Sequence, residues 1–362
     1  MSRFHALRVK HIQRETPEAV SVEFDVPTEL KETFKFKHGQ YVAIKVDVNG
    51  DELRRSYSIC SSPHENKLCV AVKEIENGRV SGYFNRELRE GDVMEVMPPL
   101  GNFTVPLDAG NRKTYVAFAA GSGITPIISI LKAVLETEPN STFRLFYGNK
   151  ESKSVIFHKE LEELQARYTD RFHVHILYSR QRSGDPLFEG RISREKIEAL
   201  AEKYPAVTRA DEFFLCGPKP MIEAASDLLQ ARGVAKEKVH FELFTTAIPG
   251  EVADADPDTP ESKGPEENSG ISKVLIILDG DETEIEIPKG TTILDAAIDA
   301  GLDAPFACTG GSCCTCRAKM LEGHAEMEIN YALTDKEVAD GYILTCQSHP
   351  TTPRMVVDFD AS

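Results

Sequence analysis

The chain has 362 residues, of which 41% are hydrophobic and 28% charged, a composition typical of globular proteins with two or three cores. No apolar run approaches the ~18–20 residues of a membrane-spanning helix, and the first residues lack the apolar stretch of a signal peptide. The net charge of −16 excludes the basic excess that nucleic-acid binding requires. We therefore expect a cytoplasmic protein whose partners include neither nucleic acid nor membrane.

Residues 1–108 alternate short β-type stretches with turns. Stretches 41–46 and 68–72 are rich in valine and alternate with turn signals such as His38-Gly39, Asn49-Gly50 and Asn77-Gly78. This pattern predicts an antiparallel β-barrel or sandwich.

Residues 109–246 change to strand–helix alternation. We expect strands at 115–120, 143–147, 173–177 and 213–216, with helical stretches between them. Such alternation predicts a second domain with an α/β sheet.

Residues 247–270 contain four prolines, seven acids and one lysine, and no aromatic residue. A segment of this composition buries too little apolar area to order itself, so we predict a flexible acidic linker.

Residues 271–362 hold six basic and sixteen acidic side chains, so the linker and this region together account for the excess negative charge. A hairpin is expected through Asp279-Gly280, followed by a helix with Thr292 as N-cap and Gly301 just past its end. A short domain of this kind, with a cysteine-rich loop next, suggests an α+β β-grasp ferredoxin.

The cysteine-rich loop carries the most specific signal in the chain. Cys308, Cys313 and Cys316 give C-x₄-C-x₂-C, and Cys346 follows 30 positions later. This is the ligand spacing of plant-type [2Fe–2S] clusters, whereas structural zinc sites, the alternative, usually repeat C-x₂₋₄-C in pairs. Cys314 falls outside the spacing and is not expected to be a ligand.

A one-electron cluster cannot accept a hydride, so a second cofactor must split the electron pair, and a flavin is the usual choice. Arg55, Tyr57 and Ser58 form R-x-Y-S on a predicted strand. Gly78 and Ser81 follow as G-x-x-S before a helical stretch at 83–88, and a turn that opens a helix can hold a pyrophosphate. Taken alone, R-x-Y-S also fits an edge strand with a surface arginine.

The strand at 115–120 leads into Gly121-Ser-Gly-Ile-Thr-Pro126 and an apolar helix at 127–135. Strand, glycine turn and helix form the context of a dinucleotide-binding loop, with Thr125 as N-cap and Pro126 at the first helical position. A generic glycine-rich turn is the alternative for this motif alone. A later strand ends at Cys216 and leads into Gly217-Pro218 and another helix.

The order of these motifs resembles that of the ferredoxin–NADP⁺ reductase family with a C-terminal plant-type ferredoxin domain. The motifs are R-x-Y-S, G-x-x-S, the glycine loop, C-G-P-x-x-M and the cysteine loop. The resemblance implies an FAD-binding β-barrel at 1–108, an NAD(P)-binding α/β domain at 109–246 and a [2Fe–2S] domain at 271–362. FAD is the usual flavin, although one branch of the family carries FMN. The residues implied to contact the flavin are Arg55, Tyr57, Ser58, Gly78, Val80, Ser81, Thr125 and Phe244.

The same resemblance implies a nicotinamide site, lined by Gly121, Gly123, Pro126, Asn149, Ser179, Arg180, Gly217 and Pro218. Cys216 would face the transferred hydride, and Ser58 and Glu242 would complete the catalytic group. Ordinary packing of a strand end explains Cys216 as well, and strand alternation explains Glu242 and Phe244. In family members that prefer NADPH, a Ser–Arg pair at the place of Ser179-Arg180 binds the 2′-phosphate, so NADPH is favoured over NADH; a solvated arginine is the alternative.

The whole domain order is shared by the reductase subunits of phenylacetyl-CoA epoxidases, 3-ketosteroid hydroxylases and several aromatic hydroxylases. The stretches 54–62, 119–126, 328–333 and 341–347 most resemble the first group. The implied function is electron transfer from NADPH through FAD and [2Fe–2S] to an oxygenase component, a di-iron protein of aromatic catabolism and phenylacetate degradation. The alternatives are a reductase for a 3-ketosteroid hydroxylase or a Rieske dioxygenase, or a redox carrier or sensor without enzymatic turnover.

Overall fold

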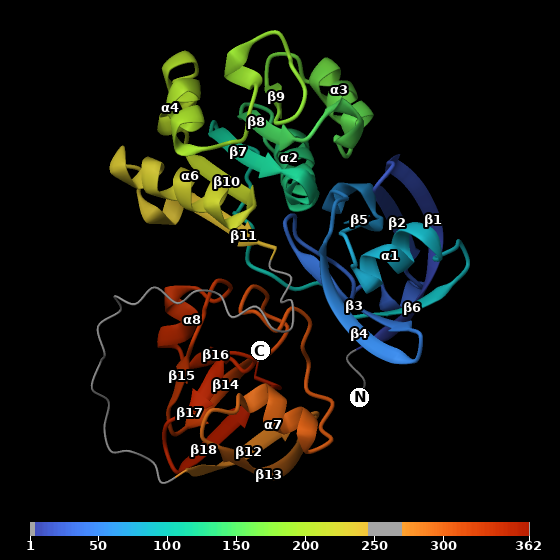
Figure 1. Cartoon of the computed structure of the whole chain (residues 1–362), viewed down its shortest axis with the longest axis vertical. Helices are drawn as coiled ribbons and strands as arrows, with labels where there is room; N and C mark the ends of the chain where they lie inside the picture. Colours follow the sequence, from blue (N-terminus) through green and yellow to red (C-terminus); the bar gives the residue numbers. More distant parts are fainter. Residues whose placement is uncertain (1–3, 245–269, 362) are drawn as a thin grey trace. The chain divides into compact units, whose positions relative to one another are not determined.

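The computed structural model describes residues 4–244 and 270–361, drawn in colour in Figure 1. These residues form two compact units, of which one is Phe4–Phe244 and the other holds the described C-terminal residues. No helix of the described residues is long and apolar enough to cross a membrane. The predicted linker lies outside the described residues except for Gly270, and the predicted domain limits stay predictions.

The first part of the larger unit is an antiparallel barrel of six strands, as predicted. The strands follow the order β4-β3-β6-β1-β2-β5, and a bridge between Ile59 and Val70 closes the barrel between β4 and β5. One helix, α1, packs on β5, β3 and β2. The elements are β1 (His5–Thr16), β2 (Ala19–Asp25), β3 (Tyr41–Val48), β4 (Asp51–Ser58), β5 (Leu68–Lys73), α1 (Arg79–Arg86) and β6 (Val93–Val96).

Alternation along the strands builds the core of the barrel. Val20, Val22 and Phe24 of β2 point inward together with Val42 and Ile44 of β3. Because side chains on one face of a strand recur every second residue, this apolar spacing fixes the face that is buried.

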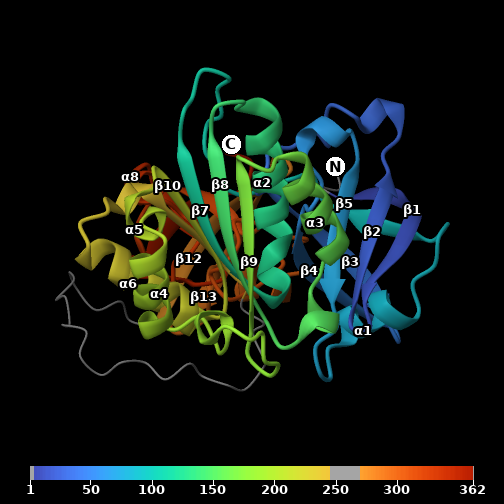
Figure 2. The ribbon, with the colours of Figure 1, turned by 90° about the horizontal axis from the view of Figure 1, so that it is seen from above.

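The second part of the larger unit is the predicted α/β sheet, in which all five strands are parallel in the order β11-β10-β7-β8-β9. Helices α2 and α3 lie on one face, and α4, α5 and α6 lie on the other (Figure 2). The strands are β7 (Thr114–Ala120), β8 (Thr142–Asn149), β9 (Phe172–Tyr178), β10 (Glu212–Gly217) and β11 (Val239–Leu243). The helices are α2 (Ile124–Thr137), α3 (His158–Arg167), α4 (Arg194–Lys203), α5 (Ala206–Arg209) and α6 (Lys219–Ala231).

The beginning of α2 corrects one prediction. Gly121–Gly123 form a 3₁₀ turn that continues directly into α2 at Ile124, so Thr125 is not the N-cap and Pro126 is not the first helical residue. The hydroxyl of Thr125 donates to the carbonyl of Ser122 (3.0 Å). Pro126 still lies in the first turn, where no intrahelical N–H bond is lost. Helix α1 likewise begins at Arg79, earlier than the predicted stretch 83–88.

Helix α2 joins the barrel to the sheet. The hydroxyl of Ser129 on α2 donates to the carbonyl of Ser61 in the barrel (2.7 Å), and the buried Lys132 pairs with Glu65 of the barrel and Glu160 of α3. Removing one partner of a buried ion pair is costly, so these contacts fix the two parts of the unit against each other.

The C-terminal unit is the predicted α+β ferredoxin domain, with a five-stranded sheet in the order β13-β12-β18-β14-β16 and a small sheet of β15 and β17. Thr292 caps α7 by accepting a bond from the backbone N–H of Asp295 (3.1 Å), and Gly301 adopts φ +81° beyond the helix, both as expected. The elements are β12 (Ile271–Leu278), β13 (Asp281–Pro288), α7 (Ile293–Asp299), β14 (Arg317–Glu322), β15 (Ala325–Met327), α8 (Asp335–Ala339), β16 (Tyr342–Leu344), β17 (Ser348–Pro350) and β18 (Arg354–Asp358).

Candidate functional site

Three residues from different parts of the larger unit meet at the end of the sheet. Glu242 of β11 lies opposite Cys216 of β10 in the parallel ladder. Ser58, the last residue of β4, donates a hydrogen bond from its hydroxyl to a carboxylate oxygen of Glu242 (3.0 Å). The three residues predicted to be catalytic are thus neighbours, although 184 positions separate Ser58 from Glu242 in the chain.

Cys216 is completely buried, and this burial, together with the charge of Glu242, raises the pKa of its thiol well above the ordinary value. A neutral, buried thiol is a poor nucleophile, so its contribution is to shape and polarity. The glycine loop packs closely against the backbone of Cys216, because a Cβ atom at Gly123 would lie 2.1 Å from the carbonyl oxygen of Cys216. Only glycine permits this approach.

The R-x-Y-S motif lies on β4 beside helix α1. Tyr57 packs against Phe84 of α1 with their ring centroids 5.2 Å apart, and burial raises the pKa of its hydroxyl. Arg55 is exposed on the same strand, and among the described residues its guanidinium forms no ion pair, while one N–H donates to the carbonyl of Arg54 (2.7 Å). An exposed cation beside an aromatic ring and a helix N-terminus fits the pyrophosphate and ring of FAD.

The G-x-x-S turn forms the beginning of α1. A Cβ atom at Gly78 would lie 2.3 Å from the hydroxyl of Ser81 and 2.4 Å from the side chain of Ile75, so no larger residue fits. That hydroxyl accepts a bond from the N–H of Ile75 and donates to the carbonyl of Gly78, which closes the turn. The side chain of Val80 is buried in the barrel core, so only its backbone can contact a phosphate.

The dinucleotide loop is held from two sides. Gly121 has φ +56°, and its carbonyl accepts a hydrogen bond from the hydroxyl of Tyr147 on β8 (2.9 Å). On the barrel side, a Cβ atom at Gly121 would lie 4.0 Å from Nζ of Lys73, the last residue of β5. Burial and the charge of Lys150 lower the pKa of Lys73, while Glu18 opposes this shift. The ammonium group of Lys73 also pairs with Glu18 (3.9 Å), so one cation, partly balanced by a carboxylate, lies beside the glycine loop.

The residues predicted at the other end of the nucleotide lie together at the carboxyl ends of β8 and β9. The backbone N–H of Ser179 donates to the carbonyl of Asn149, and that of Arg180 donates to Lys150 (both 2.9 Å). Asn149 is 7% exposed, and its side-chain oxygen has no hydrogen-bond partner among the described residues. Neither Lys150 nor Arg180 forms an ion pair within 4–244. An amide oxygen without a partner and two cations outside ion pairs fit the hydroxyl groups of a ribose and a nucleotide phosphate.

Gly217 and Pro218 lead from β10 into α6, with Pro218 as N-cap. A Cβ atom at Gly217 would lie 2.7 Å from the terminal methyl of Met221 and 3.1 Å from Cβ of Ala120, so this turn packs tightly. Phe244 follows β11 and is 42% exposed. An exposed ring two residues after Glu242 fits the predicted contact with a flavin ring.

In the C-terminal unit, the four predicted ligands converge from two segments. Cys308 hydrogen-bonds Cys313, Cys316 hydrogen-bonds Cys346, and each pair lies within reach of the other's charge. The bond from Cys308 lowers the pKa of the Cys313 thiol, against the effect of burial. The two pairs supply four thiols, the donor set of a [2Fe–2S] cluster, although no three of the described ligand side chains lie close enough together to hold a metal ion as they stand.

The backbone around these thiols is shaped to approach sulfur. The N–H of Gly310 donates to Sγ of Cys308 (3.4 Å), and Gly311 has φ +69°. Cys314 lies outside the two pairs, because its thiol donates to the carbonyl of Ala332 (3.4 Å). This contact agrees with the expectation that Cys314 is not a ligand.

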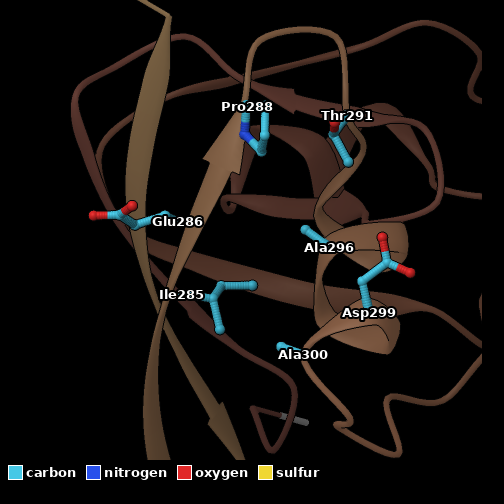
Figure 3. A pocket seen from close by; sticks show the side chains of 7 residues that line it. All are labelled: Ile285, Glu286, Pro288, Thr291, Ala296, Asp299 and Ala300. Carbon is cyan, nitrogen blue, oxygen red and sulfur yellow. The ribbon is translucent and has the colours of Figure 1, made fainter.

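A hollow of about 430 Å³ lies elsewhere on the same unit, between β13 and α7 (Figure 3). Ile285 of β13 faces Ala296 of α7 and Ala300, which follows that helix, and Asp299 lies at the margin of the hollow. No cysteine lines this hollow, so it is not part of the metal centre.

Sequence reasoning missed Lys73 and Tyr147. Lys73 is the last residue of β5, one position beyond the predicted stretch 68–72, and a lysine there carries no signal of its own. Tyr147 is fully buried within a strand, where an aromatic residue is read as core. Only the packing of β5 and β8 around Gly121 reveals their positions.

Three family models match consecutive parts of the chain. They describe an oxidoreductase FAD-binding domain at residues 6–105, an oxidoreductase NAD-binding domain at 118–227 and a 2Fe-2S iron-sulfur cluster binding domain at 276–351. These matches agree with the barrel, the parallel sheet and the cysteine loop described above.

Whole-length similarities extend this result. The chain is 40% identical to the E component of 1,2-phenylacetyl-CoA epoxidase from Escherichia coli (strain K12), covering 100% of this chain and 99% of that protein. It is 33% identical to the ferredoxin reductase component of 3-ketosteroid-9-alpha-monooxygenase from Rhodococcus rhodochrous, covering 99% and 97%. Among solved structures, phthalate dioxygenase reductase matches with a TM-score of 0.58 at 25% identity, covering 98% of each chain.

Proposed function

Because this chain belongs to the ferredoxin reductase-type oxidoreductases, with FAD-, NAD- and [2Fe–2S]-binding domains in one polypeptide, we propose that it supplies electrons from NADPH to a di-iron phenylacetyl-CoA epoxidase. The 40% identity to the Escherichia coli epoxidase component over the entire chain carries this choice of partner. When bound, FAD accepts a hydride and the cluster passes electrons singly. The reducing cytoplasm suits a chain whose function needs four free thiols.

At the hydride-transfer end, Ser58, Cys216 and Glu242 would surround the reacting atoms. Glu242 holds the hydroxyl of Ser58 in one orientation, which leaves that oxygen able to accept a hydrogen bond from a reduced flavin nitrogen. Cys216, neutral and buried, excludes water and contributes no competing charge. The task of these residues is orientation and the holding of a proton, not covalent catalysis.

At the phosphate end, Arg180 and Lys150 would bind the 2′-phosphate, and Lys73 would neutralise the pyrophosphate above Gly121. An arginine without a carboxylate partner can present its fork to a phosphate with two parallel N–H bonds. This arrangement favours NADPH over NADH.

In the C-terminal unit, Cys308, Cys313, Cys316 and Cys346 would hold the cluster. The surface of this unit is strongly acidic, with exposed Asp279, Asp281, Glu282, Glu284, Glu286, Asp295, Asp299, Asp303, Glu322, Glu326, Glu328, Asp335, Asp340 and Asp360. We expect it to dock on a partner with a complementary positive surface.

The test is NADPH oxidation coupled to oxygenation of phenylacetyl-CoA by the epoxidase complex, with purified holoprotein as the only reductant. Parallel reactions contain a 3-ketosteroid hydroxylase or a Rieske dioxygenase. Coupling in the phenylacetyl-CoA reaction supports the proposal, whereas product in another system alone contradicts the partner.

A second candidate has its own support, because the 33% match to the 3-ketosteroid system also spans the chain. The same parallel reactions distinguish it. A redox carrier without turnover would show no nucleotide-dependent reduction of ferricyanide or cytochrome c, although cofactors were bound.

A further inference from the structure

Gln347 connects the two segments that carry the cysteine ligands. It follows Cys346 directly and is 8% exposed. Its side-chain amide donates two hydrogen bonds, one to the carbonyl of Thr309 and one to the carbonyl of Cys346 (both 2.9 Å). Thr309 follows Cys308 and lies 38 positions away in the chain. One side chain therefore ties the ligand loop to the segment of the fourth cysteine.

Thr309 needs such a restraint. Its φ is +51°, in the left-handed region that a β-branched residue avoids. Its side chain is exposed, and its hydroxyl donates only to the adjacent carbonyl of Cys308 (2.8 Å). Strained conformations of this kind persist only where the surroundings hold them. The bond from Gln347 to the carbonyl of Thr309 supplies this hold.

The left-handed turn directs two backbone amides at sulfur. The N–H of Gly310 points to Sγ of Cys308 (3.4 Å), and the N–H of Gly311 bonds to Cys346. The side chain of Gln347 also hydrogen-bonds the thiol of Cys346 directly. Gly311 also packs on the same glutamine, because a Cβ atom there would lie 3.3 Å from Cγ of Gln347 and 2.8 Å from the carbonyl of Ile329. Any shift of Thr309 would carry both amides with it.

We propose that Gln347 is a positioning residue of the iron–sulfur site, which holds Thr309 in its left-handed conformation and thereby fixes the amides of Gly310 and Gly311 against two ligand sulfurs. This role rests on the proposed ligation of the cluster by the four cysteines. Amide bonds to sulfur stabilise the more negative, reduced cluster, and they also anchor the ligands. Gln347 therefore affects the reduction potential of the cluster and its retention.

The test uses the full-length holoprotein with Gln347→Leu, and Gln347→Glu as a second variant of the same size that lacks the two N–H donors. The readouts are the reduction potential, the EPR spectrum of the reduced cluster, and the rate of cluster loss in chelator. We expect a lower potential, an altered spectrum and cluster loss about 10- to 100-fold faster. Flavin reduction by NADPH should be unchanged.

A double-mutant cycle tests the mechanism. Thr309→Gly removes the cost of the left-handed turn, so Gln347→Leu should accelerate cluster loss much less in that background. Thr345→Val is the matched control, because it removes a buried bond to the carbonyl of Cys316 (2.9 Å) without touching Thr309. Its effect should be the same in both backgrounds.

Two results would overturn the proposal. One is an unchanged potential, spectrum and rate of cluster loss in both Gln347 variants. The other is a rate effect of Gln347→Leu that is equally large with threonine or glycine at 309. None of these readouts uses an oxygenase or its substrate, so a wrong partner assignment would leave them unaffected.

Discussion

One hydrogen bond joins Ser58 and Glu242, two of the residues proposed for the hydride-transfer site. The barrel supplies the hydroxyl and the last strand of the sheet supplies the carboxylate, with 3.0 Å between the two oxygens. Neither side chain would keep its orientation alone, because a serine rotates freely and a glutamate has three rotatable bonds. The pair therefore fixes the direction from which the serine oxygen can accept a hydrogen bond.

We expect Glu242→Gln and Ser58→Ala each to slow flavin reduction by NADPH at least about tenfold, because positioned proton-handling groups typically contribute more than that. Stopped-flow bleaching of the flavin measures the rate directly. FAD content and nucleotide affinity should change little. Variants that retain FAD and bleach at the wild-type rate would show that the bond has no catalytic role.

His38 links stability to pH in the larger unit. Its Nε2 atom accepts a hydrogen bond from the backbone N–H of Val105 (3.4 Å). Burial lowers its pKa to about 4, while the charge of Glu138 opposes the shift. The histidine is 7% exposed. In the unfolded chain the pKa of His38 is about 6.5. Between pH 6.5 and pH 4 the imidazole is therefore protonated in the unfolded state and neutral in the folded state.

Above pH 6.5, His38 therefore does not affect the free energy of unfolding. As the pH drops toward 4 this free energy decreases, by about 2 kcal/mol at pH 5. We expect the thermal release of FAD, followed by its fluorescence, to shift to lower temperature between pH 7 and pH 5. His38→Gln, which keeps an acceptor for Val105, should shift less. An equal shift in both proteins would assign the pH dependence to other groups.

The residues proposed to bind the 2′-phosphate meet at the carboxyl ends of β8 and β9 because these strands are parallel and in register. Asn149 pairs with Tyr178 at the end of the ladder, and the next two residues of each strand continue side by side. Polar groups from two loops thus gather at one edge, as is typical of open α/β sheets. No single loop contains the whole site.

Arg180→Ala should weaken NADPH far more than NADH. A charge-assisted arginine–phosphate contact contributes about 1.5–3 kcal/mol, or roughly 10- to 150-fold in affinity. The ratio of KM values for the two nucleotides is the measurement. Arg167→Ala, at the exposed end of α3, is the matched control and should change neither value. If Arg180→Ala changed the KM values for both nucleotides equally, Arg180 would not bind the 2′-phosphate, and Lys150 or Arg182 would be the better candidate.

For the whole chain, the separation into two compact units predicts separable electron-transfer steps. Cys316→Ser should abolish electron delivery to one-electron protein acceptors and leave flavin bleaching by NADPH nearly intact, because the residues proposed for hydride transfer all lie in Phe4–Phe244. Cytochrome c reduction and stopped-flow bleaching measure the two steps. Bleaching that slows by orders of magnitude with FAD still bound would contradict this separation.

The charge distribution predicts a salt effect on transfer to the oxygenase. The net charge of −16 comes from the linker and the ferredoxin domain, and exposed charges are screened beyond about 8–10 Å at physiological ionic strength. Coupled NADPH oxidation should slow as salt rises, while flavin bleaching changes less. Equal salt dependence of both steps would show that the acidic surface does not guide docking.

The cysteine spacing, the glycine turns and the alternation of strands and helices were readable from the chain alone because each depends on local rules. A C-x₄-C-x₂-C loop, a helix that opens after Gly-Ser-Gly, and a capped helix at Thr292 each form within about ten residues. The fold class and the cofactor domains followed from these motifs and were confirmed by the structure and by the family matches.

Contacts between distant segments could not be obtained in this way. The bond from Ser58 to Glu242, the approach of Lys73 to Gly121 and the clamp of Gln347 on Thr309 join residues that no local pattern relates. The start of α2 was also misjudged, because the glycine turn coils directly into the helix and makes a side-chain cap at Thr125 unnecessary. Local preferences determine which helices and strands form, but tertiary packing determines which side chains meet. The proposed site consists of side chains that only this packing brings together.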